Sequence, residues 1–188
     1  MGRAWLYYTT LKRDFRKNFF PIGTSCIVYM ITANDMSDFY RSGLSLKWRN
    51  QREHAEEECI DKLEYELCNV KRPCTVTLFM SWTPCSECVP IIIDFVQRHR
   101  NVRLRILAAR IYYHEEPENR EGLRILFTYC VDLKMMKWAD YYFLWYSFGD
   151  NKSISRELIY KPHPYHGITN WETELRKILQ GGRRKVFR

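Results

Sequence analysis

Hydrophobic and polar positions divide the chain into alternating strands and helices. Apolar runs and strict alternation predict five strands, at residues 26–32, 44–48, 74–81, 102–111 and 133–136. Apolar residues at helical spacing predict helices at residues 3–18, 55–68, about 85–100, 119–130 and 138–148. Thr169 and Glu172 form a capping box for a further helix, which ends before Gly181. The pattern therefore predicts an α/β protein.

The order of these elements constrains the sheet. A strand at 102–111, a helix at 119–130 and a strand at 133–136 indicate a right-handed crossover and a parallel pair of strands. The segment 138–148 is apolar nearly all round, so we expect a well-buried helix. We expect one domain over residues 1–182, followed by a basic tail at 183–188.

The net charge and the cysteine content limit the possible binding partners and the cellular compartment of the protein. The formal net charge of +8 points to a polyanion, either nucleic acid or an acidic membrane surface. Residues 1–188 contain no apolar run near the roughly 20 residues of a membrane span, and no secretory signal pattern begins them. Seven cysteines, five of them in apolar elements as small hydrophobic residues, indicate a reducing compartment, the cytoplasm and/or the nucleus.

Two short motifs carry the candidate chemistry. One is His54-Ala55-Glu56, and the other is Pro84-Cys85-Ser86-Glu87-Cys88. One imidazole and two thiolates form a three-ligand zinc site, and catalytic zinc sites keep the fourth position for water. The pattern H-x-E followed by P-C-x-x-C is the known signature of zinc-dependent base deaminases. Both motifs fall at predicted helix N-termini, so we expect Zn²⁺ to bind His54, Cys85 and Cys88 there.

The residue two places after the histidine completes the expected chemistry. Zinc-bound hydroxide would attack C4 of cytosine or C6 of adenine, and Glu56 would carry protons to the ring and to the leaving ammonia. A purely structural zinc site needs a fourth protein ligand. The nearest candidates, Cys59 and Cys74, fall on predicted core faces. The sequence therefore favours a catalytic metal over a structural one.

The stretch Ser81-Trp82-Thr83-Pro84-Cys85 resembles the AID/APOBEC family of polynucleotide cytidine deaminases, and is closest to the AID and apolipoprotein-B-mRNA-editing branches. Residues 109–113 and 119–123 also match family stretches, and the similarity covers roughly residues 5–148. The resemblance implies a cytidine-deaminase-like fold, with a five-stranded mixed sheet flanked by about six helices and the last two strands parallel. It also implies deamination of cytosine to uracil in single-stranded DNA, sometimes RNA.

The same resemblance implies a set of substrate contacts. Trp82 would form a floor of the base pocket, and Tyr112 would pack against the flipped cytosine. The residues 110–114 would read the base 5′ of the target. Tyr113 stands where some family members carry an acidic residue associated with a 5′ thymine, so we hypothesise that 5′-TC is not enforced. The predicted substrate-binding set is Thr24, Asn50, Ala55, Trp82, Thr83, Arg110, Tyr112 and Tyr113.

Two other readings remain open at the level of sequence. A tRNA-type adenosine deaminase also uses His-Ala-Glu and Pro-Cys-x-x-Cys, although Ser81-Trp82 and the aromatic residues at 112–113 speak against it. A nucleic-acid-binding protein with an intact but catalytically silent zinc site is the second alternative. Tyrosines next to arginines provide the aromatic and basic side chains that bind single-stranded nucleic acid.

We expect the protein to be a monomer or a weak dimer.

Overall fold

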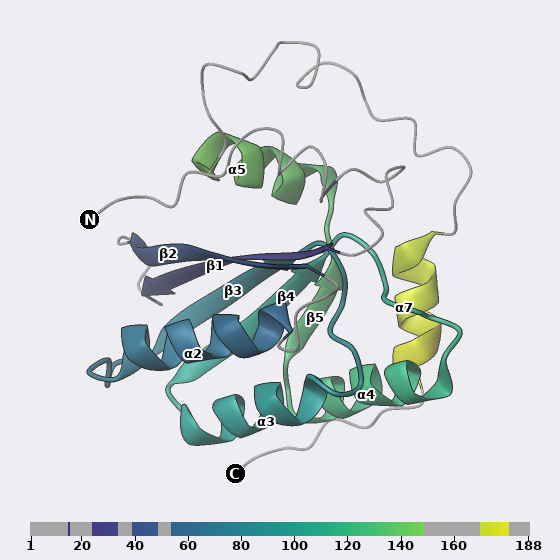
Figure 1. Ribbon diagram of the computed structural model, residues 1–188, viewed down its shortest axis with the longest axis horizontal. Coiled ribbons are helices and arrows are strands. Elements are labelled where there is room, and N and C mark those ends of the chain that lie inside the picture. Colours follow the sequence, from purple (N-terminus) through teal and green to yellow (C-terminus); the bar gives the residue numbers. More distant parts are fainter. Residues whose placement is uncertain (1–14, 16–23, 34–38, 49–53, 149–169, 181–188) are drawn as a thin grey trace.

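A single five-stranded sheet forms the centre of the molecule (Figure 1). The computed structural model describes residues 15, 24–33, 39–48, 54–148 and 170–180, and gives the backbone alone for Thr24, residues 39–48 and Trp145. The strands are β1 (Thr24–Ala33), β2 (Phe39–Trp48), β3 (Cys74–Met80), β4 (Val102–Ala108) and β5 (Asp132–Met135). Their order across the sheet is β2-β1-β3-β4-β5.

The direction of the strands brings several strand ends to one edge. β1 pairs antiparallel with both β2 and β3, whereas β3, β4 and β5 pair in parallel. β2, β3, β4 and β5 therefore all run in the same direction, and their carboxyl ends share an edge. Ligand sites in open α/β sheets lie at this edge. The segments that follow β3 and β4 carry the Pro-Cys-x-x-Cys motif and the aromatic residues at 112–113.

Helices cover both faces of the sheet (Figure 1). One side carries α2 (Ala55–Leu67), α3 (Val89–Arg98) and α4 (Pro117–Thr128), with α7 (Trp171–Leu179) beside α4. The other side carries α5 (Trp138–Phe148). The described residues thus include five helices. The predicted helix at 3–18 lies outside them, apart from Phe15, which is buried with the α5 side of the core.

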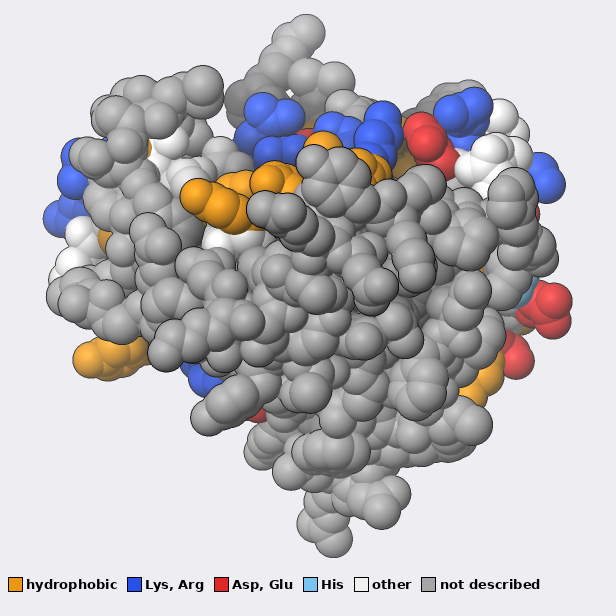
Figure 2. Space-filling model, turned by 90° about the horizontal axis from the view of Figure 1, so that it is seen from above, with side chains coloured by type: hydrophobic (Ala, Val, Ile, Leu, Met, Phe, Trp, Pro, Cys, Tyr) orange, Lys and Arg blue, Asp and Glu red, His pale blue; other side chains and the backbone are white. Residues whose placement is uncertain are grey.

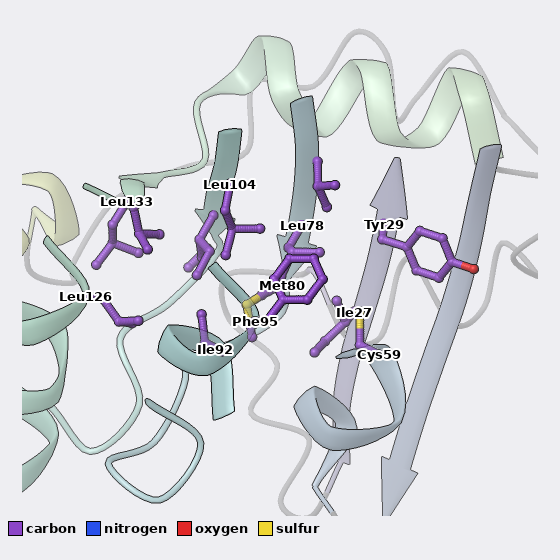
Figure 3. Packing of buried hydrophobic residues seen from close by; sticks show 14 of the residues in the cluster. Ile27, Tyr29, Cys59, Leu78, Met80, Ile92, Phe95, Leu104, Leu126 and Leu133 are labelled. Carbon is purple, nitrogen blue, oxygen red and sulfur yellow. The ribbon is translucent and has the colours of Figure 1, made fainter. Parts of the chain in front are cut away.

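The alternation of side chains along β3 separates two hydrophobic cores. Val76, Leu78 and Met80 face α2 and α3, while Phe79 faces α5. Figure 3 shows the larger core, in which Cys59 of α2 and Phe95 of α3 lie against the sheet. The period of two predicted for residues 74–81 is confirmed, and so is the parallel crossover through α4.

Several boundaries and burials differ from the predictions. β2 begins at Phe39 rather than at residue 44, and β4 ends at Ala108 rather than at residue 111. The helix expected from Thr169 is capped instead by Asn170, whose side chain accepts a hydrogen bond from the backbone N–H of Thr173 at 3.2 Å. Asn170 shares with Thr169 the ability to cap a helix N-terminus, so composition alone did not separate them.

The burial expected of two cysteines and of one helix is also wrong. Cys68 and Cys130 are exposed, because each lies just beyond the end of a helix and outside its apolar face. α5 is buried along one side only, and Tyr142, Phe143 and Tyr146 are exposed. Figure 2 looks onto the α5 side of the molecule, where Lys and Arg side chains gather beside hydrophobic ones along the upper edge. No helix among the described residues is long and apolar enough to cross a membrane.

Candidate active site

The N-terminus of α2 presents His54 and Glu56 from one helical turn. His54 is the N-cap residue, and its backbone N–H donates to Glu57 Oε2 at 2.6 Å. This is the return half of a capping box, in which a glutamate at the third helical position satisfies the N-cap amide. Glu57 thereby fixes the backbone that carries the predicted ligand. His54 is half-buried, whereas Glu56 is only 7% exposed.

The two cysteines come from the turn that leads into α3. The backbone N–H of Cys88 donates to the carbonyl of Cys85 at 3.2 Å, and Cys88 is the N-cap of α3. Pro90 follows at the second helical position, where its missing N–H costs nothing. The amide ends of α2 and α3 both carry partial positive charge, which favours thiolates and carboxylates at these positions.

His54, Cys85 and Cys88 converge to one point and can hold a metal ion. Their ligand atoms all lie within 4.8 Å of one another. His54 Nδ1 lies 3.1 Å from Cys88 Sγ and 3.3 Å from Cys85 Sγ, and the two sulfur atoms are 3.4 Å apart. The three residues predicted from spacing are therefore brought together. Cys59 and Cys74, the alternative ligands, are fully buried in the larger core.

The thiols and the carboxyl group of this cluster have strongly shifted pKa values. The hydrogen bond between the two cysteines lowers the pKa of Cys85 to about 5 and raises that of Cys88 far above its usual value. Burial raises the pKa of Glu56 to about 7. Burial alone would lower the pKa of His54, but the charge of Cys85 and a hydrogen bond to it outweigh this effect and raise it. A cluster of shifted groups at helix N-termini is typical of a functional site.

Comparison with known proteins agrees with this geometry. A family model described as APOBEC3, cytosine deaminase domain, matches residues 24–181. The chain belongs to the AID/APOBEC family of cytosine deaminases. It is 32% identical to the C->U-editing enzyme APOBEC-1 of Rattus norvegicus over 171 residues, which are 90% of this chain and 69% of that protein. It is 31% identical to the DNA dC->dU-editing enzyme APOBEC-3H of Macaca mulatta over 141 residues, or 75% of this chain and 65% of that protein.

The chain covers a smaller share of a human relative. Against the C->U-editing enzyme APOBEC-1 of Homo sapiens, the chain is 34% identical over 137 residues, which are 72% of this chain and 54% of that protein. The chain therefore spans between about half and just over two thirds of these three relatives. The cytosine deaminase domain that the family model matches, residues 24–181, includes both candidate metal-binding motifs.

The deaminase domain places an aromatic pair beside the cysteine motif. Tyr112 meets the edge of Trp82 with ring centroids 6.3 Å apart, and both side chains are half-buried. Thr83 is buried, and its hydroxyl accepts a hydrogen bond from the backbone N–H of Tyr112 at 3.0 Å. Tyr113 is 56% exposed and contacts Tyr112 edge-on at 4.6 Å. The structure thus gathers the predicted aromatic residues at one end of the sheet.

Arg110 is buried, whereas a direct contact with substrate would need a side chain that faces solvent. Its side chain is only 1% exposed, and its Cζ lies 4.4 Å from the centroid of the Trp82 ring. Its Nε donates to the carbonyl oxygen of Ser81 at 3.2 Å. In this conformation the guanidinium supports Trp82 from within the protein. Ala55 is also buried, while the Thr24 side chain and Asn50 lie outside the described residues.

Asn119 is a residue of the site that sequence reasoning did not single out. It is buried, and its Oδ1 accepts from the backbone N–H of Ser86, between the two cysteines, at 2.9 Å. Its Nδ2 donates to the carbonyl of Tyr113 at 3.5 Å. Gly122, one turn further along α4, lets the helix approach the same turn: a Cβ there would lie 2.9 Å from Val89 Cγ2. The match of residues 119–123 to the family was the available signal.

Proposed function

We propose that this protein is a zinc-dependent deaminase that converts cytosine to uracil in single-stranded DNA or RNA. The observation that carries the proposal is the convergence of His54, Cys85 and Cys88 beside the buried carboxyl group of Glu56. A histidine and two cysteines are the donor set that zinc prefers. The family membership of the chain supports cytosine as the base that is deaminated. The basic and aromatic residues support a polynucleotide as the substrate.

The separations between the ligand atoms suit a zinc ion. Bonds of about 2.3 Å to sulfur and about 2.0 Å to nitrogen place tetrahedral ligands roughly 3.5 Å apart. The three observed separations, 3.1, 3.3 and 3.4 Å, fall slightly below this value. Among the described residues the group consists of three side chains, which matches a catalytic rather than a closed structural site. Zinc held there would lower the pKa of a coordinated water and so supply the nucleophile near neutral pH.

Glu56 is proposed to move the protons of the reaction. Its carboxylate would take a proton from the attacking water, deliver it to N3 of cytosine, and later transfer a proton to the departing amino group. Water and cytosine thus become uracil and ammonia, with no other reactant. Because Glu56 lies in the first turn of α2, two residues after the N-cap His54, the same turn would hold the proton carrier beside the metal ligand. Burial of the carboxyl group keeps bulk water from competing for the proton.

The polynucleotide substrate is supported by the residues around the metal site. Trp82, Tyr112 and Tyr113 form a chain of edge-to-face contacts at the end of β3 and β4. Bases of single strands stack on such aromatic side chains, and each contributes about 1–3 kcal/mol on replacement by alanine. Trp82 and Tyr112 are the residues we propose to bracket the flipped cytosine. Tyr113, which is more exposed than Tyr112, is proposed to contact the neighbouring 5′ base. Thr24 and Asn50 remain proposed contacts.

A substrate panel tests the proposal. The purified, zinc-loaded chain is incubated with a cytosine-containing single-stranded DNA, and with matched RNA, duplex DNA, free cytidine and an adenine-containing strand. We expect uracil in single-stranded polynucleotide, no product in duplex or free cytidine, and loss of product after zinc chelation. Inosine from the adenine strand would contradict the assignment of the base. Binding to single strands without any product from the zinc-loaded protein would instead identify a silent binding module.

A further inference from the structure

The segment 111–116, which carries Tyr112 and Tyr113, is attached to α7 through one arginine. Arg120 of α4 donates from Nη1 to the carbonyl oxygen of His114 at 3.1 Å, and from the same nitrogen to Glu174 Oε1 at 2.9 Å. Glu174 lies on α7, 54 positions further along the chain. The side chain of Arg120 is 28% exposed and that of Glu174 is 13% exposed. Charge-assisted bonds of this kind, partly shielded from water, are stronger than surface ion pairs.

The first turn of α7 also touches this segment directly. The rings of Trp171 and His114 meet edge to face, with centroids 5.2 Å apart. Trp171 is the first residue of α7, and Asn170 caps the helix immediately before it. Figure 1 shows α7 standing beside the end of α4 that follows the segment. The segment is therefore held from the α7 side at the backbone of His114 and at its ring.

From His114 the contacts run back to the metal site. Tyr113 adopts a φ angle of +32°, which L-residues rarely occupy and which persists only where the surroundings hold it. Its carbonyl accepts from Asn119, and Tyr112 is bonded to Thr83. The ring of Tyr112 in turn lies against Trp82. A displacement of His114 would therefore change the position of both tyrosines relative to Trp82.

We propose that α7 sets the preference for the base 5′ of the target cytosine, with Arg120 and Glu174 as positioning residues. The pair holds residues 111–116 in one conformation, in which Tyr113 is exposed at the position proposed to meet the 5′ base. This inference rests on the proposed function of the site. The inference adds that selectivity depends on α7, and none of the described residues of α7 belongs to the candidate metal centre.

Arg124 offers a matched control within the same interface. It lies one turn after Arg120 on α4, is equally exposed at 28%, and also binds α7, through a hydrogen bond from its Nε to the carbonyl of Ile178 at 2.9 Å. Its Nη1 donates to Glu121 Oε2, so both of these bonds are made to residues outside the segment 111–116. Loss of Arg124 should thus weaken the docking of α7 without releasing His114.

The experiment compares Glu174→Gln, Arg120→Gln and Arg124→Gln with the unaltered chain. Initial rates are measured on four single-stranded DNAs that differ only in the base 5′ of the cytosine. We expect the ratio between the best and worst 5′ base to change by about threefold or more in Glu174→Gln and Arg120→Gln, because weakening one charge-assisted bond releases the segment. Arg124→Gln should lower the melting temperature about as much as the other two substitutions do, but it should leave the ratio between the 5′ bases unchanged. An equal change of the ratio in all three variants, or in none, would overturn the proposal.

Hydrogen exchange supplies a readout that does not depend on activity. Amides at 112–116 should exchange faster in Glu174→Gln than in Arg124→Gln, which should instead affect the C-terminal half of α7. If the unaltered chain deaminates nothing, the proposed function fails. In that case, faster exchange at 112–116 in Glu174→Gln alone would still support the proposal that Arg120 and Glu174 hold this segment, and unchanged exchange would refute it. Faster exchange with an unaltered base preference would refute the role in selectivity.

Discussion

Arg110 lies beneath Trp82, with its guanidinium carbon 4.4 Å from the ring centroid and its side chain almost completely buried. A buried cation of this kind needs partners, and it finds the Trp82 ring and the Ser81 carbonyl oxygen. Both partners belong to the segment that links β3 to the two cysteines of the candidate metal site. The contact therefore positions the proposed floor of the base pocket from inside the protein.

Replacement of Arg110 by methionine tests this arrangement, because methionine retains most of the volume and removes the charge and the donors. We expect a loss of about 2–3 kcal/mol in the free energy of unfolding, because the substitution removes the charged hydrogen bond to Ser81 and the cation–π contact with Trp82. Urea unfolding measures it. Arg98→Met is the control, since Arg98 is half exposed in surface ion pairs and should cost less than about 1 kcal/mol. Unchanged stability with a shallower salt dependence of oligonucleotide binding would make Arg110 a phosphate contact instead.

Asn119 couples the cysteine turn to the aromatic segment, so its removal should loosen the metal site. In Asn119→Ala the backbone N–H of Ser86 loses its partner, which costs roughly 1–3 kcal/mol when that group stays buried. We expect faster loss of zinc to a chelator and lower thermal stability. The exposed neighbour Glu118 provides the control substitution, Glu118→Ala. Equal zinc release by both variants would show that Asn119 does not support the metal ligands.

Gly122 permits the close approach of α4 to the start of α3. A Cβ at this position would lie 2.9 Å from Val89 Cγ2 and 3.5 Å from Ser86 Cα. Although alanine favours helix formation, we expect Gly122→Ala to destabilise the protein by about 1–3 kcal/mol through overpacking. Adding Val89→Ala should recover part of this loss, since it removes the closest atom. Additive effects of the two substitutions in urea unfolding would contradict the predicted contact.

The pairing of Glu174 with Arg120 predicts a pH dependence of stability. The hydrogen bond from Arg120, together with the charge of Lys177, holds the pKa of Glu174 below its ordinary value of 4.5. A lowered pKa in the folded state stabilises the protein above pH 4.5, and this contribution is lost as the pH falls through the folded-state pKa. We therefore expect the difference in unfolding free energy between the unaltered chain and Glu174→Gln to shrink on acidification. A difference that stays constant from pH 7 to about pH 3 would contradict the ion pair.

Sequence signals were sufficient to locate the five strands, apart from some of their ends, and the three residues that could hold a metal ion. The period of two in β3 predicted which side chains face each core, and the deaminase signature predicted that His54, Cys85 and Cys88 converge. The first follows from short-range geometry, because successive side chains of a strand point to opposite faces of the sheet. The second joins residues 31 positions apart and depended on a motif of known function. The parallel pairing of β4 and β5 followed from the crossover rule.

Features that depend on distant partners could not be predicted in this way. Nothing local to Arg110 indicates that its side chain turns inward beneath Trp82. The bond from Arg120 to Glu174 joins residues 54 positions apart, and no pattern along either helix specifies it. The exposure of Tyr142 and Tyr146 likewise reflects which side of α5 meets the sheet, a choice that a helix apolar nearly all round leaves open. Tertiary packing decides such cases.

The central claim, that Glu56 carries protons beside a bound zinc ion, is tested most directly by Glu56→Gln. Zinc content and turnover of a cytosine in single-stranded DNA are measured together, with Glu58→Gln as a control of equal charge change on the same helix. The account predicts full zinc occupancy in the unaltered chain and in both variants. Turnover should be near normal for Glu58→Gln and should fall by at least about 100-fold for Glu56→Gln. Turnover close to normal in zinc-loaded Glu56→Gln would contradict the mechanism.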